Sequence, residues 1–136
     1  MIELNQVYTH DFQFTQDDVI KFADVTGDHN PVHLDPVYAA TTLFKKPIIH
    51  GMLGAAVFSK VFGTLFPGDG TIYLKQSLSF RNPLYVGTAY QAVFTVLEVE
   101  KEKNRLTIET LIKETGTGTL ITKGEATVMV TPDKLS

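Results

Sequence analysis

M-L-G-A-A-V-F-S-K-V-F, residues 52–62, is the most apolar segment of the chain, and only Ser59 and Lys60 within it are polar. A helix that is apolar almost all round is normally buried. The small residues at 54–56 indicate that another element packs closely against the helix backbone. The segment therefore predicts a buried central helix. Its strongly apolar part, residues 52–58, is far too short to span a bilayer.

The chain downstream of this helix changes to runs rich in β-branched and aromatic residues. These runs predict strands at 71–80, 88–99, 105–113 and 120–130, and a partly alternating stretch upstream predicts another at 6–14. The separators 102–104 and 116–118 are short and turn-forming, so the strands that they join are expected to be antiparallel neighbours. The economical arrangement is an α+β fold in which about five antiparallel strands wrap around the central hydrophobic helix.

Composition narrows the classes to which the protein can belong. Its 136 residues, 43% hydrophobic and 20% charged, are typical of one soluble globular domain, which we expect to span residues 1–136. The net charge is −3 and no basic run occurs, so binding to nucleic acid is not expected. Cysteine is absent, which rules out a thiol nucleophile and fits a reducing compartment. We expect a cytoplasmic protein without a signal peptide.

The edges of the predicted sheet and the end of the chain carry two further expectations. An open sheet leaves an edge strand that needs protection, and pairing with a second copy is one remedy. We therefore expect a homodimer. Residues 131–136 form a polar tail, which is expected to be frayed.

Two shorter helices are predicted between the first strand and the central helix. Thr15 and Asp18 have the spacing of a capping box, and Gly27 is well placed to end the helix that they begin. Asp35 followed by Pro36 combines a cap with a first-turn residue and predicts a second helix at 36–43.

The polar segment G-D-H-N-P-V-H-L-D, residues 27–35, begins where the first of these helices ends. Pro31 lacks an N–H and pushes Asn30 toward extended geometry, so the helix cannot continue through it. The resulting bend can turn the Asp28 carboxylate and the His33 imidazole toward one water molecule, a pairing that suits general acid–base chemistry. Taken alone, the same residues also fit a polar surface loop.

Four segments together carry a resemblance to a known family. They are D-H-N-P-V-H (28–33), P-I-I-H-G-M (47–52), F-S (58–59) and Y-L-K-Q-S-L-S-F-R-N-P (73–83). With them the chain resembles the MaoC-like (R)-specific enoyl-CoA hydratases, including the short forms that supply polyhydroxyalkanoate synthesis. The resemblance implies a hot-dog fold, a homodimer with active sites near the subunit interface, an acyl-CoA substrate and a place in fatty acid metabolism.

The resemblance also implies a reaction, the reversible (R)-specific hydration of trans-2-enoyl-CoA to (R)-3-hydroxyacyl-CoA. Asp28 and His33 match the family's catalytic dyad, and Gly51 matches the glycine whose backbone N–H receives the thioester carbonyl. Hydration needs one group to deprotonate water, one to protonate C2 and a donor for the thioester oxygen. Asp28 and His33 can share the first two tasks in either order. Gly51 would supply the donor at the positive end of a helix dipole. No metal or redox cofactor is required.

The sequence gives weaker indications for the roles of four other residues. Asn30 matches a polar residue that supports the dyad, and Ser59 matches a serine near the catalytic centre. Phe62 lies three positions along the same helix face, so it is expected to line the same pocket and to limit acyl length, although a core position suits a phenylalanine equally. His50 is expected to orient the loop through a hydrogen bond rather than to act in catalysis.

Charged and metal-binding alternatives are less favoured. Lys45, Lys46 and Arg81 are candidate contacts for the phosphates of CoA, but solvated surface charge is the simpler interpretation. His29 and His33 have an i,i+4 spacing that is known from zinc sites. Pro31 prevents the helix that this spacing requires, so no metal site is expected.

Three alternative functions remain open. A 3-hydroxyacyl-[acyl carrier protein] dehydratase would use the same dyad with a different carrier. A thioesterase of this fold commonly places a catalytic acid on the central helix, but residues 52–62 contain no Asp or Glu. A non-catalytic, acyl-thioester-binding subunit would be expected to have lost Asp28 or His33, and this chain keeps both.

Overall fold

The computed structural model of the chain describes residues 1–135. Its strands are β1 (Val7–Phe12), β2 (Ile72–Gln76), β3 (Ser79–Phe80), β4 (Tyr90–Glu100), β5 (Arg105–Glu114) and β6 (Leu120–Met129). Its helices are α1 (Gln16–Thr26), α2 (Pro31–Leu34), α3 (Pro36–Ala40) and α4 (Gly51–Thr64), with 3₁₀ turns η1 (Lys101–Lys103) and η2 (Pro132–Lys134). The last residue, Ser136, which the domain and tail predictions include, lies outside the described residues.

The strands form one antiparallel sheet in the order β1-β4-β5-β6-β2, and β3 also pairs with β6. The run predicted at 71–80 forms two strands rather than one, so the sheet has six strands instead of about five. The break occurs at Ser77, whose N–H donates to the Glu125 carbonyl at 2.9 Å and whose hydroxyl accepts from the Glu125 N–H at 3.0 Å. Gly124 permits this crossing, because a Cβ there would lie 1.9 Å from the Ser77 carbonyl oxygen.

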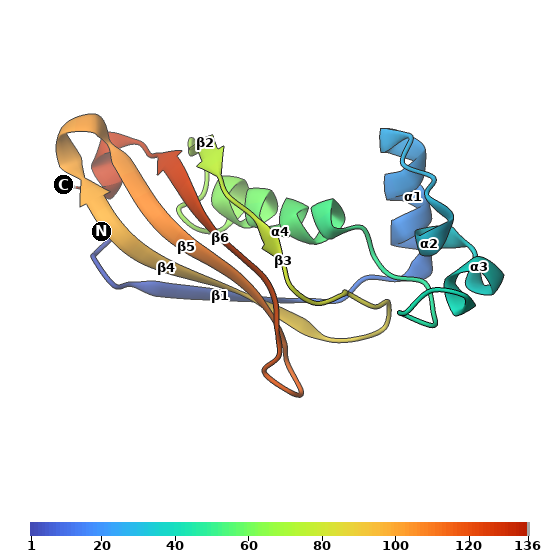
Figure 1. Cartoon of the computed structure of the whole chain (residues 1–136). Helices are drawn as coiled ribbons and strands as arrows, with labels where there is room; N and C mark the ends of the chain where they lie inside the picture. The colour runs from blue at the N-terminus through green and yellow to red at the C-terminus, as the bar shows by residue number, and fades with distance from the viewer. Residues whose placement is uncertain (136) are drawn as a thin grey trace.

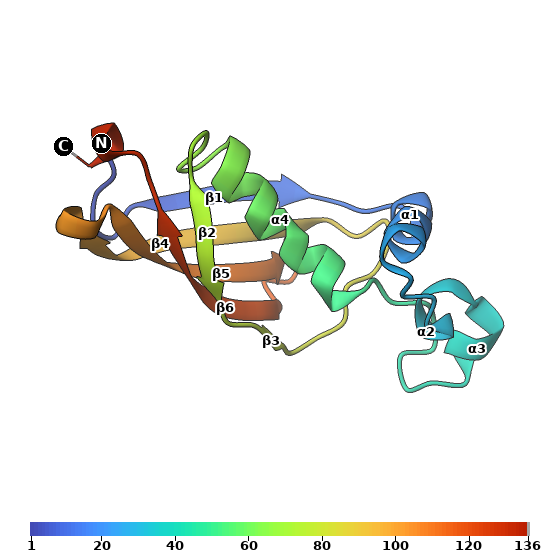
Figure 2. The same ribbon diagram turned by 90° about the horizontal axis from the view of Figure 1, so that it is seen from above.

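The core lies between α4 and the concave face of the sheet. Side chains alternate along the long strands, and the buried ones on β5 are Leu106, Ile108, Thr110 and Ile112. The sheet curves around α4, which lies across this face (Figures 1 and 2). Phe58 and Phe62 of α4 pack edge-on against Phe94 of β4, with ring centroids 5.7 and 5.3 Å apart. Burying a side chain of this kind contributes about 1.5–3 kcal/mol. This is the hot-dog arrangement that the family resemblance implied.

One face of α4 is exposed, which corrects the prediction of a buried helix. Its exposed residues are Met52, Ala56, Ser59, Lys60 and Thr64. The apolar composition of the helix predicts contact with other elements but does not say that one face stays open in a single chain. The close approach predicted at 54–56 is confirmed at Gly54, where a Cβ would lie 2.4 Å from Cδ1 of the buried Leu84.

Helices α1, α2 and α3 lie beyond one end of the sheet (Figure 1). The predicted capping box is confirmed, because Asp18 N–H donates to Thr15 Oγ1 at 3.2 Å and Thr15 N–H donates to Asp18 Oδ2 at 2.9 Å. Gly27 ends α1 with a left-handed φ of 80° and donates its N–H to Ala23. α3 is shorter than predicted and ends at Ala40.

The end of the chain is ordered up to Leu135, which corrects the prediction of a frayed tail. Residues 132–134 form η2, and Leu135 is buried in the core at 4% exposure. The Lys134 carbonyl accepts a hydrogen bond from the Ile2 N–H at 2.9 Å, so the two ends of the described chain are joined. Within residues 1–135, no helix is both long enough and apolar enough to cross a membrane.

Two glycines of α4 provide a matched test of this packing. Gly54→Ala places a methyl group against buried Leu84, and we expect it to lower the free energy of unfolding by roughly 1–3 kcal/mol. At Gly63 a Cβ has no neighbour within 4 Å among the described residues, so Gly63→Ala is expected to raise it by up to about 1 kcal/mol. Urea unfolding measures both. Effects of the same sign would contradict the described packing.

Candidate active site

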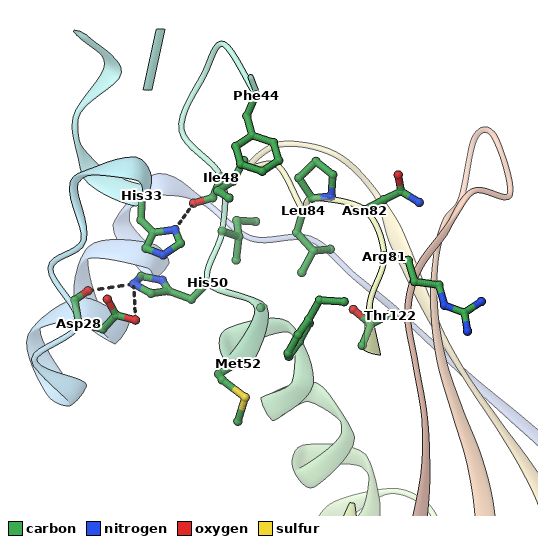
Figure 3. Close-up of a pocket in the computed structure, with 14 residues that line it drawn as sticks. Asp28, His33, Phe44, Ile48, His50, Met52, Arg81, Asn82, Leu84 and Thr122 are labelled. Carbon is green, nitrogen blue, oxygen red and sulfur yellow. Dashed lines mark hydrogen bonds and ion pairs between the residues drawn. The ribbon is translucent and has the colours of Figure 1, made fainter. Parts of the chain in front are cut away.

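A pocket of about 370 Å³ lies where the α1–α2 loop, the segment leading into α4 and the residues after β3 meet (Figure 3). It is lined by Asp28, His33, Phe44, Ile48, Ile49, His50, Gly51, Met52, Phe80, Arg81, Asn82, Pro83, Leu84 and Thr122. Asp28, His33 and His50 gather at one side of this pocket, whereas Arg81 and Asn82 lie on the opposite side (Figure 3). Most of the remaining wall is apolar. The pocket therefore combines an acid–base cluster with a surface that suits an acyl chain.

Local backbone chemistry places Asp28 and His33 on the same wall. Gly27 ends α1, and after a short loop α2 begins at Pro31. The Asn30 side chain caps α2 by accepting from the Val32 N–H at 3.2 Å. Asp28 Oδ1 in turn accepts from the Asn30 N–H at 3.3 Å. Asn30 therefore holds the short helix that carries His33, and it is not among the residues that line the pocket.

His33 is buried at 8% exposure, and its hydrogen bonds determine which ring nitrogen is free. Nδ1 lies 2.8 Å from the Ile48 carbonyl oxygen, which can only accept a hydrogen bond. We therefore assign the hydrogen of the neutral ring to Nδ1, which leaves the lone pair on Nε2 available as a proton acceptor. The His33 carbonyl accepts from Gln16 Nε2 of α1 at 3.1 Å, which fixes α2 against α1.

His29 and His33 have different surroundings, which shift their pKa values in opposite directions. Burial lowers the pKa of His33 below its usual value of 6.5, and the neighbouring His50 adds to this, against opposing effects of the Ile48 hydrogen bond and Asp28. His29 is exposed, and its hydrogen bond to Asp24 raises the pKa of its imidazole above 6.5. His33 is accordingly neutral near pH 7, as a general base must be.

His50 belongs to this cluster more closely than the sequence indicated. It is 2% exposed, and its ring lies against that of His33, with a centroid separation of 3.8 Å and an interplanar angle of 31°. Its Nε2 lies 3.0 Å from the Asp28 carbonyl oxygen and 4.0 Å from Asp28 Oδ2 (Figure 3). The predicted hydrogen bond to the loop is therefore present. The contact with His33 was not predicted, because no local pattern links residues 17 positions apart.

Asp28, His33 and His50 could in principle hold a cation, since one ligand atom from each lies within 4.8 Å of the others. This grouping differs from the pair of His29 and His33 that the sequence suggested, because His29 turns outward to Asp24. A carboxylate and two imidazoles at this separation are equally a general acid–base set. Both histidines are held by hydrogen bonds to backbone carbonyls, His33 to Ile48 and His50 to Asp28.

Gly51 begins α4 at the wall of the pocket. No side chain from the described residues caps this end of the helix, so its first N–H groups point outward without that competitor. The Phe80 ring covers Gly51, and a Cβ at position 51 would lie 2.7 Å from it. A glycine here leaves room for the Phe80 ring beside the start of α4.

The remaining predicted residues lie farther from the cluster. Ser59 lines a second pocket of about 460 Å³ between α4 and β2, and Met52 lines both pockets. Phe62 is 1% exposed and packs edge-on against Tyr73, which lines the second pocket. Ser59 and Phe62 are therefore not both at one pocket wall in the described chain. Which surroundings each of the two residues faces depends on how α4 is rotated, which the helical spacing alone does not specify.

The three candidate phosphate contacts differ in their surroundings. Arg81 is exposed and lines the pocket opposite Asp28. Lys46 lies over the Tyr85 ring, 4.2 Å from its centroid. Lys45 is exposed in a turn with a φ of 68°. Only Arg81 of the three lines the pocket, which makes it the best placed to meet a charged group at the pocket mouth.

Comparison with known proteins gives a matching family and relatives that share one described activity. The model of the MaoC-like domain family matches residues 3–118. The chain is 43% identical to an (R)-specific enoyl-CoA hydratase of Aeromonas caviae over 93% of this chain and 94% of that protein. It is also 43% identical to an (R)-specific enoyl-CoA hydratase of Rhodospirillum rubrum, over 85% and 79% of the two chains.

Solved structures show the same likeness in three dimensions. The (R)-hydratase from A. caviae that is involved in polyhydroxyalkanoate biosynthesis superposes with a TM-score of 0.91 at 42% identity, over 96% of this chain and 98% of that one. An unliganded R-hydratase from Pseudomonas aeruginosa gives a TM-score of 0.89 at 41% identity, over 95% and 82% of the two chains.

The opposite pKa shifts of the two histidines can be measured directly. In an NMR titration of the imidazole groups, we expect His33 to titrate below pH 6.5 and His29 above it. Asp24→Asn removes the partner of His29 and should return only that residue toward its ordinary value, leaving His33 unchanged. A reversed order of the two midpoints in the unmodified protein would contradict the described environments.

Proposed function

The chain belongs to the MaoC-like domain family, and we propose that it is an (R)-specific enoyl-CoA hydratase in which Asp28 and His33 perform the chemistry. It is a hydro-lyase that adds water reversibly to trans-2-enoyl-CoA and yields (R)-3-hydroxyacyl-CoA. One observation supports the assignment of these two residues above all others. A carboxylate oxygen and an imidazole nitrogen lie within 4.8 Å of each other at the wall of a largely apolar pocket, next to the start of α4.

This separation is the one that a single water molecule requires. A water forms hydrogen bonds of about 2.8 Å, so it can bridge two acceptors that lie within 4.8 Å of each other. In the proposed reaction the water oxygen bonds to C3 of the enoyl group while His33 Nε2 accepts one of its protons. Asp28 accepts a hydrogen bond from the hydrogen that remains on the new hydroxyl group, and so orients the water during attack. Neutral His33 with a free Nε2 is suited to this role.

The second half of the reaction returns the proton. Attack at C3 moves the electron pair of the double bond through C2 toward the thioester oxygen, which becomes negatively charged. The Gly51 N–H at the positive end of α4 would stabilise this charge, and one such donor is worth roughly 2.7–4 kcal/mol of barrier in other enzymes. The imidazolium of His33 then protonates C2 and regenerates the neutral base. Every proton and electron pair is accounted for by the water, the substrate and His33.

The substrate is proposed to lie along both pockets. Arg81 at the mouth of the first pocket is placed to meet the charged carrier, and the thioester would lie beside Gly51. An acyl chain longer than the first pocket would pass Met52, which lines both pockets, toward Ser59. Phe62 supports Tyr73 from behind and so would limit acyl length indirectly. Asn30 acts through its cap on α2.

We also propose that the enzyme is a homodimer. β2 lies at one edge of the sheet and carries the exposed side chains of Ile72 and Leu74. Met52, which lines both pockets, and Phe80, which lines the first, are further exposed apolar residues. An unprotected edge with exposed apolar residues is a surface that a second copy would cover. The active site would then lie near the interface.

Replacement of the dyad tests the proposed chemistry. Asp28→Asn and His33→Gln are each expected to lower kcat for crotonyl-CoA hydration by roughly 100- to 10,000-fold, the usual range for a lost acid–base group. His29→Gln, adjacent in sequence but exposed, is the matched control and should retain nearly full activity. The loss of enoyl-thioester absorbance reports the rate, and circular dichroism checks folding. Near-normal rates in a folded Asp28 or His33 variant would refute the assignment.

Light scattering after size exclusion tests the homodimer. We expect a mass of twice the 15.1 kDa chain. A charge at the exposed β2 edge, as in Leu74→Lys, should shift the species toward the mass of one chain. Val37→Lys changes an equally apolar but 80% exposed residue on α3 and should leave the mass unaltered. A monomeric unmodified protein would exclude this assembly.

A further inference from the structure

His50 makes contacts that a purely structural histidine does not need. Its ring is buried between the rings of Phe22 and His33, whose centroids lie 4.8 and 3.8 Å from its own. Its Nδ1 is buried and has no hydrogen-bond partner among residues 1–135. Leaving a buried polar atom unpaired lowers stability, a cost that a phenylalanine filling the same space would avoid. A histidine in this position therefore implies a use for the polar end of its ring.

The polar end of the His50 ring forms a hydrogen bond through Nε2. This nitrogen lies 3.0 Å from the Asp28 carbonyl oxygen, an acceptor only, so we assign the ring hydrogen to Nε2 and the lone pair to the unpartnered Nδ1. The same nitrogen is 4.0 Å from Asp28 Oδ2. One side chain thus contacts both proposed members of the dyad, Asp28 by its donor and His33 by its ring face (Figure 3).

We propose that His50 is the positioning residue of the hydratase site, where its Nε2–H holds Asp28 at the distance from His33 that one water can bridge. This role presupposes the proposed hydration reaction. The α1–α2 loop lies outside the sheet, and Asp28 itself is exposed, so the loop needs an anchor from the rigid part of the molecule. His50 provides it because it directly precedes α4, and the adjacent Ile49 pairs with the buried Leu84. Through His50 the position of the carboxylate is tied to the central helix.

Two substitutions of His50 test the role of its hydrogen-bond donor and the role of its aromatic ring separately. His50→Phe keeps an aromatic ring between Phe22 and His33 but removes the donor to Asp28. His50→Gln loses the ring and keeps an N–H donor at about the same reach. We expect His50→Phe to lower kcat for crotonyl-CoA by roughly 10- to 100-fold with little change in KM, since misplacing a reacting group by about 1 Å has effects of that size. His50→Gln should restore kcat to within roughly 5-fold of the unmodified enzyme.

The outcomes distinguish positioning from packing. If His50 only fills space, the ring-preserving phenylalanine would keep full activity and glutamine would be the poorer variant. Either full kcat in folded His50→Phe, or equal loss in both folded variants, would overturn the proposal. Thermal unfolding of each variant confirms that the rates refer to folded protein.

An NMR measurement on the unmodified protein is independent of activity and of whether the variants fold. In the unmodified protein, long-range ¹⁵N–¹H correlations should show the hydrogen of His50 on Nε2 at neutral pH. The Nδ1–H form would overturn the proposal, because it cannot donate to the Asp28 carbonyl. In folded His50→Phe the amide signals of residues 28–30, 32 and 33 should move, and in folded His50→Gln they should stay near their original positions. If no enoyl thioester is hydrated, the proposed function fails while these NMR results still decide the positioning role.

Discussion

One face of α4 packs into the curve of the sheet, and the position of every group at the site follows from that contact. The rings of Phe58 and Phe62 meet Phe94, and Gly54 brings the helix backbone against Leu84. This packing fixes the place in the molecule at which the first turn of α4 lies. Because the helix starts at Gly51, the same contact places the Gly51 N–H and a positive helix end at the wall of the pocket.

The acid–base groups reach that wall from a different part of the chain. They lie on a segment outside the sheet, which is held to the rest of the molecule by a few hydrogen bonds. His33 is fixed by the Ile48 carbonyl, and Asp28 by the Nε2–H of His50. Both partners belong to the short segment that leads into α4. The site is therefore a loop with reactive groups, tied at two points to a rigid helix start, and its geometry depends on those ties.

Local chemistry explains why much of this arrangement could be predicted from the sequence. The capping box at Thr15, the stop at Gly27 and the break at Pro31 are each determined by neighbouring residues, and all occur as expected. The strands follow from runs of β-branched residues. The family resemblance correctly indicated the hot-dog fold and the hydratase activity.

The features that could not be predicted depend on residues far apart in the chain. The strand break at Ser77 requires Gly124 on another strand, and the order at Leu135 requires a core to pack against. The stacking of His33 on His50 depends on how two loops meet. The rotation of α4, which separates Ser59 from the acid–base cluster, is likewise a property of the whole fold. No local sequence pattern predicts any of these four features.

The most direct test of the account is the configuration of the product formed from crotonyl-CoA by the unmodified protein. The disappearance of the enoyl-thioester absorbance gives the rate, and dehydrogenases specific for each 3-hydroxyacyl-CoA enantiomer identify the product. The account predicts (R)-3-hydroxybutyryl-CoA alone. Formation of the (S) product, or failure of folded protein to hydrate crotonyl-CoA, longer enoyl-CoA and carrier-linked enoyl thioesters alike, would contradict it.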